Sequence, residues 1–177
     1  MHETRHNRAR RRTAGALVLV GAALAGACIE RPEPTLPTAH DVESYYSSVT
    51  ALDAEIRGNL AEITVVQSAN QLRRGGSLWA RVGPYIYLFT EETQRLFQDF
   101  PGLAGVRVAT RTAGGVAVAN AMLTRDELSG VLWRRSLNIA GQARRDGTER
   151  PGLLEDLIRW GEEHTEFEYS ESYNPRR

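Results

Sequence analysis

The chain has 177 residues and a formal net charge of zero, but its charges are unevenly distributed. The first 27 residues hold five arginines, and the part from residue 28 onward has 17 arginines against 21 acidic residues. That acidic balance excludes a general nucleic-acid-binding surface, which depends on neutralising phosphates. All 22 basic residues are arginine, so reactions that need a Schiff-base lysine or a P-loop lysine are also excluded.

Residues 1–27 have the pattern of a secretory signal peptide. An arginine-rich head precedes an uncharged, largely apolar run from Ala14 to Ala27, the order typical of export signals. This run of 14 residues is shorter than the roughly 20 residues that a helix needs to cross a bilayer. We therefore expect the segment to be removed rather than to span the membrane.

The single cysteine, Cys28, follows this run directly, in the segment Leu24-Ala25-Gly26-Ala27-Cys28. This segment resembles the lipobox of bacterial lipoproteins, with Ala25 at the position where the family usually has leucine. The resemblance implies cleavage before Cys28, acylation of its thiol and attachment to a membrane. Ile29, in place of the aspartate associated with inner-membrane retention, favours the outer membrane. Ordinary cleavage before an unmodified Cys28 is the alternative, since Ala25-x-Ala27 also fits a general signal peptidase.

Residues 28–40 are expected to form a tether, because Pro32, Pro34 and Pro37 favour extended backbone without hydrogen bonds. Residues 41–171 then have the length of one globular domain, and residues 172–177 are expected to form a flexible tail.

The first part of the domain predicts a helix with Asp41 as N-cap. Its apolar face comprises Val42, Tyr45, Val49, Leu52 and Ile56, and Gly58-Asn59 would end it. The same stripe could continue to Leu72. The competing interpretation is a strand over Ile63 to Val66, because these residues include β-branched side chains.

The middle of the domain contains a predicted turn, an aromatic segment and a second helix. The turn is Arg73 to Ser77, which contains two glycines. Pro84 predicts a break, so Tyr85 to Phe89 is expected to be a strand or buried segment. Thr90 then predicts the start of a helix that ends at Pro101-Gly102.

The second half of the domain predicts a hairpin, two helices and an edge strand. The hairpin lies near residues 105–123 around Gly114-Gly115, with one face expected to comprise Val106, Val108, Val116, Val118 and Met122. Thr124 and Glu127 fit a capping box for a helix to about Arg145, which Asp146-Gly147 ends. A last helix runs to His164, and residues 165–173 alternate like an edge strand. The expected fold class is α+β, with several amphipathic helices on a small antiparallel sheet.

The sequence contains few residues that could form a catalytic, metal or ligand-binding site. His164 lies among acidic residues, of which Glu162 and Glu166 are weak candidates to join it at a metal or proton-transfer site; we expect no catalytic residue, metal or cofactor. The arginine pairs at residues 73–74, 134–135 and 144–145 could bind an anion. Trp79, Tyr85 and Tyr87 could line a ligand groove, although such aromatic side chains more often belong to a core.

These observations favour a lipid-anchored, non-catalytic interaction or accessory protein of the bacterial cell envelope. Its expected partners are the membrane, through the anchor, and an envelope protein, but not nucleic acid. The first alternative is a lipid-anchored binding module for a small or anionic envelope ligand. The second is an envelope hydrolase or metal-dependent enzyme that uses His164 together with acidic residues.

Overall fold

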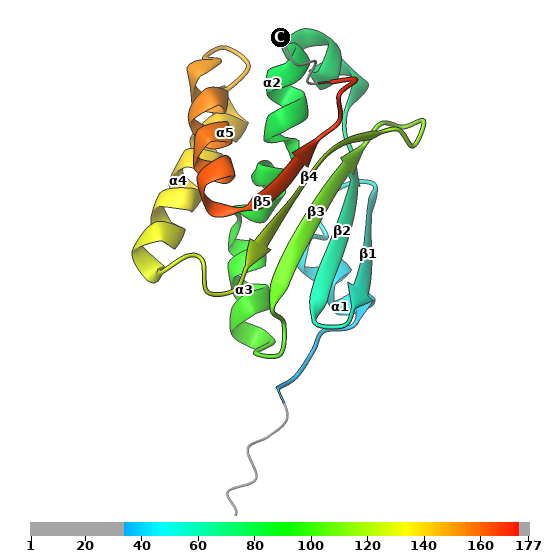
Figure 1. Ribbon diagram of the computed structural model, residues 1–177, viewed down its shortest axis with the longest axis vertical. Coiled ribbons are helices and arrows are strands. Elements are labelled where there is room, and N and C mark those ends of the chain that lie inside the picture. The colour runs from blue at the N-terminus through cyan, green and yellow to red at the C-terminus, as the bar shows by residue number, and fades with distance from the viewer. Residues whose placement is uncertain (1–33, 174–177) are drawn as a thin grey trace, which may run out of the picture. The chain divides into compact units, whose positions relative to one another are not determined.

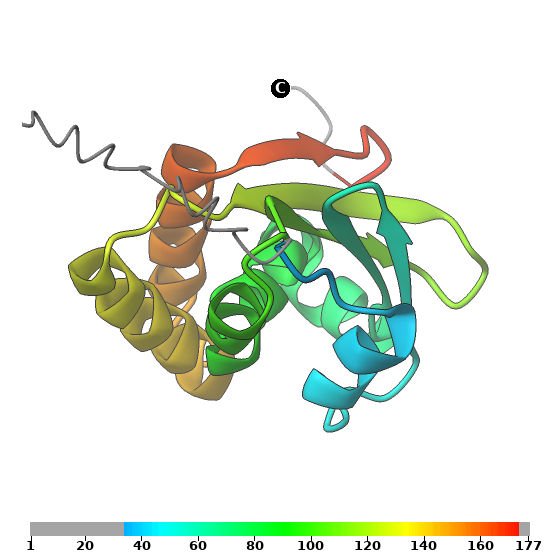
Figure 2. The same ribbon diagram turned by 90° about the horizontal axis from the view of Figure 1, so that it is seen from below.

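The computed structural model describes residues 34–173, in which five helices cover one face of a five-stranded sheet (Figures 1 and 2). The strands lie in the order β1-β2-β3-β4-β5. The helices are α1 (Ala39–Tyr45), α2 (Ala69–Leu88), α3 (Glu91–Asp99), α4 (Gly130–Asp146) and α5 (Gly152–His164). The strands are β1 (Leu52–Arg57), β2 (Leu60–Val66), β3 (Gly105–Arg111), β4 (Ala117–Thr124) and β5 (Glu166–Tyr169). This arrangement confirms the α+β class.

The sheet is mixed rather than purely antiparallel. Strands β2 and β3 pair in parallel, with Leu60 opposite Gly105, while all other neighbouring strands are antiparallel. Helices α2 and α3 form the connection that parallel neighbours require. The expected antiparallel sheet therefore omitted the central pairing, which no local pattern in either strand could indicate.

The long helix expected from Asp41 is wrong. Helix α1 ends at Tyr45, and Asp41 occupies its third position in a capping box with Thr38. The following apolar residues form a hairpin of β1 and β2, so the strand interpretation of residues 63–66 is confirmed. Gly58 at the turn has a φ of 62°, a conformation that glycine adopts without strain. This turn, rather than a helix stop, explains Gly58-Asn59.

The folded domain begins before Asp41, within the segment expected to be a tether. The backbone carbonyl of Thr35 accepts a hydrogen bond of 2.9 Å from the amide of Gly102, and Pro37 is buried. The backbone of Pro34 and Thr35 thus lies against the loop after α3, which fixes this end of the chain to the domain.

Helix α2 contains the expected turn but not the expected break at Pro84. The turn is present as a kink at Gly76, where φ is 52° and ψ is −132°. Pro84, however, lies inside the second part of the helix, and Tyr85 to Leu88 are helical rather than extended, with Phe89 as the C-cap. Tyr85, Leu88 and Phe89 are almost completely buried, so burial of this face offsets the hydrogen bond that proline removes.

The β3–β4 hairpin is confirmed, but the assignment of its faces is only partly right. Val106 and Val108 are buried, whereas Val116 is 52% exposed and Met122 belongs to the outer face. The pairing register shifts between Thr110 and Arg111. Because one extra residue reverses the alternation of a strand, the core side of β4 comprises Ala119, Ala121 and Leu123.

The capping box expected at Thr124 and Glu127 is wrong. Thr124 ends β4, and α4 begins at Gly130 after Ser129, whose hydroxyl accepts from the amide of Leu132. The end of α4 at Asp146 is confirmed, as are helix α5 and the edge strand β5, which pairs with β4.

Arg125 ties the end of α3 to the loop between β4 and α4. Its Nε donates to the carbonyl of Leu103 at 2.6 Å, and its two terminal nitrogens donate to the carbonyls of Phe97 and Phe100. One guanidinium thus satisfies three acceptors around the C-terminus of α3, where helices leave carbonyls without partners.

Candidate functional site

A cavity of about 310 Å³ lies between helix α2, the segment that joins β2 to α2, the start of α3 and the end of α4. We call it the α2 pocket. Its lining combines aromatic, amide and charged side chains, namely Tyr46, Ser48, Val49, Gln67, Gln71, Trp79, Gly83, Ile86, Tyr87, Thr90, Glu92 and Arg144. This volume and mixture are typical of small-molecule sites, in which a few polar groups orient a ligand against apolar walls.

Gln67, which lines this pocket, has an acceptor without a partner. The Gln67 side-chain nitrogen Nε2 donates to the Trp79 carbonyl at 2.5 Å, which fixes the orientation of the amide. Its Oε1 is buried and has no hydrogen-bond partner among the described residues, and the residue is only 6% exposed. A buried acceptor without a partner costs about 1–3 kcal/mol, and this oxygen is enclosed beside Gly83, out of reach of a molecule in the pocket.

Gly83 makes room for this amide. A Cβ atom at residue 83 would lie 3.0 Å from Gln67 Oε1 and 3.2 Å from Thr110 Cγ2. Because a side chain at this position would press on the amide, the glycine in α2 contributes directly to the shape of the pocket.

Two opposite charges line the pocket without pairing with each other. Arg144 donates through Nη2 to the carbonyl of Ile86 at 2.6 Å, which leaves the other nitrogens of its guanidinium for a ligand. Glu92 is half-buried and makes no ion pair or hydrogen bond through its side chain among residues 34–173. Both residues also line an adjoining surface hollow that opens between α3 and α4.

A buried hydroxyl network supports one side of the pocket. The hydroxyls of Tyr46 and Thr93 lie 2.6 Å apart, and Thr93 Oγ1 donates to the carbonyl of Tyr87 at 3.0 Å. Burial raises the pKa of Tyr46 well above its usual range. The Tyr46 ring therefore stays neutral and fixed, which positions the neighbouring backbone of α2 before a ligand arrives.

The structure separates the three aromatic residues that the sequence groups together. Trp79 and Tyr87 line the α2 pocket. Tyr85 is buried in the core, where its hydroxyl lies 2.6 Å from that of Tyr169. Burial raises the pKa of Tyr85 to about 12. Only Trp79 and Tyr87 are therefore placed to contact a ligand in this pocket.

His164 has a carboxylate partner, but that partner comes from another segment. Its Nδ1 lies 3.0 Å from Oε1 of Glu127, in the loop after β4, and its ring packs 4.2 Å from that of Trp160. Glu163 and Glu166 line the same hollow of about 190 Å³. A histidine–carboxylate pair can accept a proton from a neighbouring hydroxyl. The neighbouring hydroxyl of Thr165, however, donates its proton to the carbonyl of Gly161 instead.

Glu162 serves a different contact. Its Oε1 accepts from Arg81 at 2.5 Å and from the hydroxyl of Tyr169 at 2.9 Å, which joins α5 to α2 and β5. Within residues 34–173, no group of three or more histidine, cysteine or acidic side chains is placed to hold a metal ion. The candidates His164, Glu162 and Glu166 thus do not form one metal site there.

The arginine pairs also separate. Arg144 reaches the α2 pocket, whereas its neighbour Arg145 pairs with Asp146. Arg135 lies over the ring of Trp160 at 4.4 Å, and Arg73 donates to Asn70. Arg134 is exposed, and the side chain of Arg74 lies outside the described part. Of these arginines, Arg144 is the one that the structure places at the pocket.

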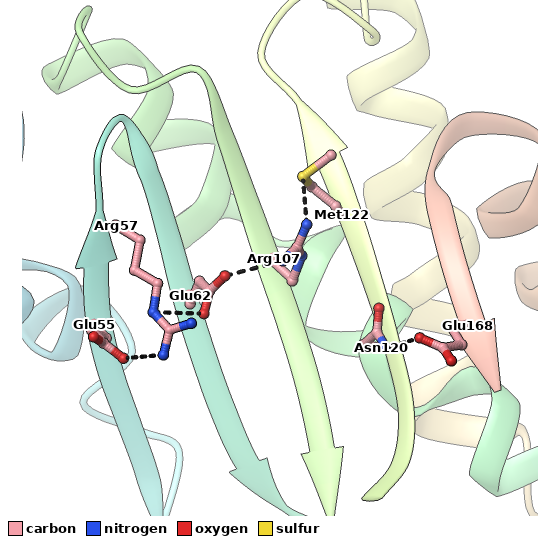
Figure 3. Close-up of polar contacts among 7 residues, drawn as sticks. All are labelled: Glu55, Arg57, Glu62, Arg107, Asn120, Met122 and Glu168. Atoms are coloured by element: carbon pink, nitrogen blue, oxygen red, sulfur yellow. Dashed lines mark hydrogen bonds and ion pairs between the residues drawn. The ribbon is translucent and has the colours of Figure 1, made fainter. Parts of the chain in front are cut away.

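The outer face of the sheet carries charges that neutralise one another (Figure 3). Glu62 on β2 contacts Arg57 on β1 at 3.4 Å and Arg107 on β3 at 3.1 Å. Arg57 also contacts Glu55 at 2.9 Å, and Asn120 donates to Glu168 at 3.3 Å. Such cross-strand pairs are typical of a solvated sheet face, and they present no field of one sign to a charged partner.

The expected signal peptide, Cys28 and the first part of the tether lie outside the described residues, as do residues 174–177. Among the helices described, none is both long and apolar enough to cross a membrane. Comparison with family models, curated proteins and solved structures finds no match.

Proposed function

We propose that this chain is a lipid-anchored protein of the bacterial cell envelope whose domain binds a small organic compound with a carboxylate group in the α2 pocket. The resemblance of the segment before Cys28 to a lipobox supports the anchor. The observation that carries the binding function is the guanidinium of Arg144 at a cavity whose wall also includes Trp79.

The pocket chemistry favours binding over catalysis. A guanidinium binds a carboxylate or phosphate through parallel hydrogen bonds, and Trp79 and Ile86 supply apolar walls for the body of a ligand. Neither histidine nor cysteine is among the residues that line the cavity. A binding module of this kind agrees with an accessory role, in which the protein presents or senses an envelope compound.

Calorimetric titration of the mature chain with two anionic probes, indole-3-propionate and glutaramate, tests the binding function. We expect at least one probe to bind, and Arg144→Gln to weaken that binding by about tenfold or more, since it removes a charge-assisted contact. Arg145→Gln is the matched control, because Arg145 is adjacent on α4 but contacts Asp146. Equal loss in both variants, or no binding of any carboxylate ligand tested, would refute the function.

The anchor is tested separately by labelling cells with a fatty-acid analogue. We expect the label on the wild-type chain and its loss in Cys28→Ala, together with release of that variant from membranes. A mature chain whose measured mass matches an unmodified Cys28 would contradict the anchor, and would leave the pocket function untouched.

A further inference from the structure

The α2 pocket brings together two opposite charges that leave each other unpaired. Glu92 and Arg144 both line the cavity and the adjoining hollow, but their charged atoms do not approach to ion-pair distance. A simple anion at Arg144 would therefore meet the negative charge of Glu92 in a half-buried setting, where repulsion is only partly screened. A ligand that carries a positive group beside its anionic group would satisfy both residues.

The pocket also has an apolar wall. It comprises the ring of Trp79 together with Ile86. A ligand that fits would thus have a body with apolar surface in addition to its two charged groups.

We propose that the ligand is a free α-amino acid. Its carboxylate binds Arg144, and its ammonium group binds Glu92. An α-amino acid holds its two charges one carbon apart, so a single small head group can bridge two side chains that do not reach each other. This inference rests on the proposed function, because it assigns a ligand class to the same pocket.

Matched ligands test the two contacts by calorimetric titration of the mature chain. L-tryptophan and L-glutamine have both charges, while indole-3-propionate and glutaramate lack only the ammonium group. We expect at least one of these amino acids to bind about tenfold more tightly than its counterpart without the ammonium group.

Two variants assign the ammonium contact to Glu92. Glu92→Gln is expected to abolish the advantage of the amino acid over its counterpart without the ammonium group. Glu155→Gln is the control, because Glu155 is an exposed acidic residue on α5 that lines neither the pocket nor the adjoining hollow. Retention of the advantage in Glu92→Gln would overturn the inference.

The result also separates the two proposals. If the anionic probes bind through Arg144 and the amino acids bind no better, the ligand class is wrong while the binding function stands. If neither the anions nor the amino acids bind, both proposals fail. Circular dichroism spectra that match the wild type show that each variant is folded, so a loss of binding reports on the pocket.

Discussion

Gly161 shows how a single missing side chain allows two elements to pack closely. A Cβ atom at this position in α5 would lie 2.4 Å from Cδ1 of Tyr85, far inside normal contact distance. Both residues are buried, and Tyr85 is on α2. The backbone of α5 therefore rests directly on the tyrosine ring, and a methyl group would force the two helices apart.

We expect Gly161→Ala to lower the free energy of unfolding by about 1–3 kcal/mol, the usual cost of overpacking a core. Gly141 is the matched control, because it lies inside α4 and a Cβ atom there would meet nothing within 4 Å. Gly141→Ala should raise the free energy of unfolding by about 0.5–1 kcal/mol, because alanine loses less conformational entropy than glycine when the chain folds into a helix. Urea denaturation measures both values, and an equal sign for the two variants would contradict this assignment.

The sequence predicted some pocket residues and not others. Trp79 and Tyr87 belong to an aromatic segment that stands out in the chain, and Arg144 belongs to a visible arginine pair. Gln67 and Glu92 carry no such signal, because their role depends on where the β2–α2 junction and the start of α3 meet. The spacing from Thr124 predicts a helix cap for Glu127. Its contact with His164, which is 37 residues away in the chain, depends on the tertiary fold and has no local sequence signal.

At the scale of the element, Arg125 acts as a side-chain cap for α3. Its three hydrogen bonds go to backbone carbonyls of Phe97, Phe100 and Leu103, and its guanidinium also lies over the ring of Phe97 at 5.1 Å. Loss of the side chain would leave these acceptors without partners near the end of the helix.

We expect Arg125→Met to lower the free energy of unfolding by about 3 kcal/mol, since charged hydrogen bonds contribute more than neutral ones. Arg134→Met should change it by less than about 0.5 kcal/mol, because Arg134 is an exposed residue of α4. Thermal and urea denaturation can both measure the difference. A cost at residue 134 as large as that at residue 125 would show that loss of charge, rather than loss of the cap, is responsible.

Element boundaries were predictable where a local signal was decisive. Thr90 is the N-cap of α3, and Asp146 ends α4, as their capping and turn residues indicate. Prediction failed where tertiary contacts outweighed local preference, as at Pro84, which lies within α2 because the surrounding residues are buried. It also failed at Met122, since the register shift beside Thr110 reverses the faces of β4.

At the scale of the whole molecule, buried tyrosines make stability sensitive to alkali. Burial raises the pKa of Tyr46 and Tyr85, the latter to about 12. In the unfolded chain tyrosine releases its proton near pH 10. Stability from these residues is therefore complete below pH 10 and is lost as the pH rises towards 12, because only the unfolded state loses its protons.

We expect the free energy of unfolding to stay level from pH 8.5 to 9.5 and then to fall, by about 1.4 kcal/mol per pH unit for each buried tyrosine. The chain has no lysine, so no lysine titration obscures this range. Urea denaturation at successive pH values measures the slope, and Tyr85→Phe should reduce it. An unchanged slope in that variant would exclude Tyr85 as a source of the effect.

The parallel pairing of β2 with β3 has a consequence for the order in which the domain folds. The β1–β2 and β3–β4 pairs are local hairpins, whereas Leu60 and Gly105 meet only after about 45 residues have been closed into a loop. Closing that loop costs chain entropy before the contacts between β2 and β3 can form, which slows folding. We expect the two hairpins to form early and the β2–β3 pairing to form late. Pulsed hydrogen exchange would then protect the β2 amides bonded to β1 before those bonded to β3.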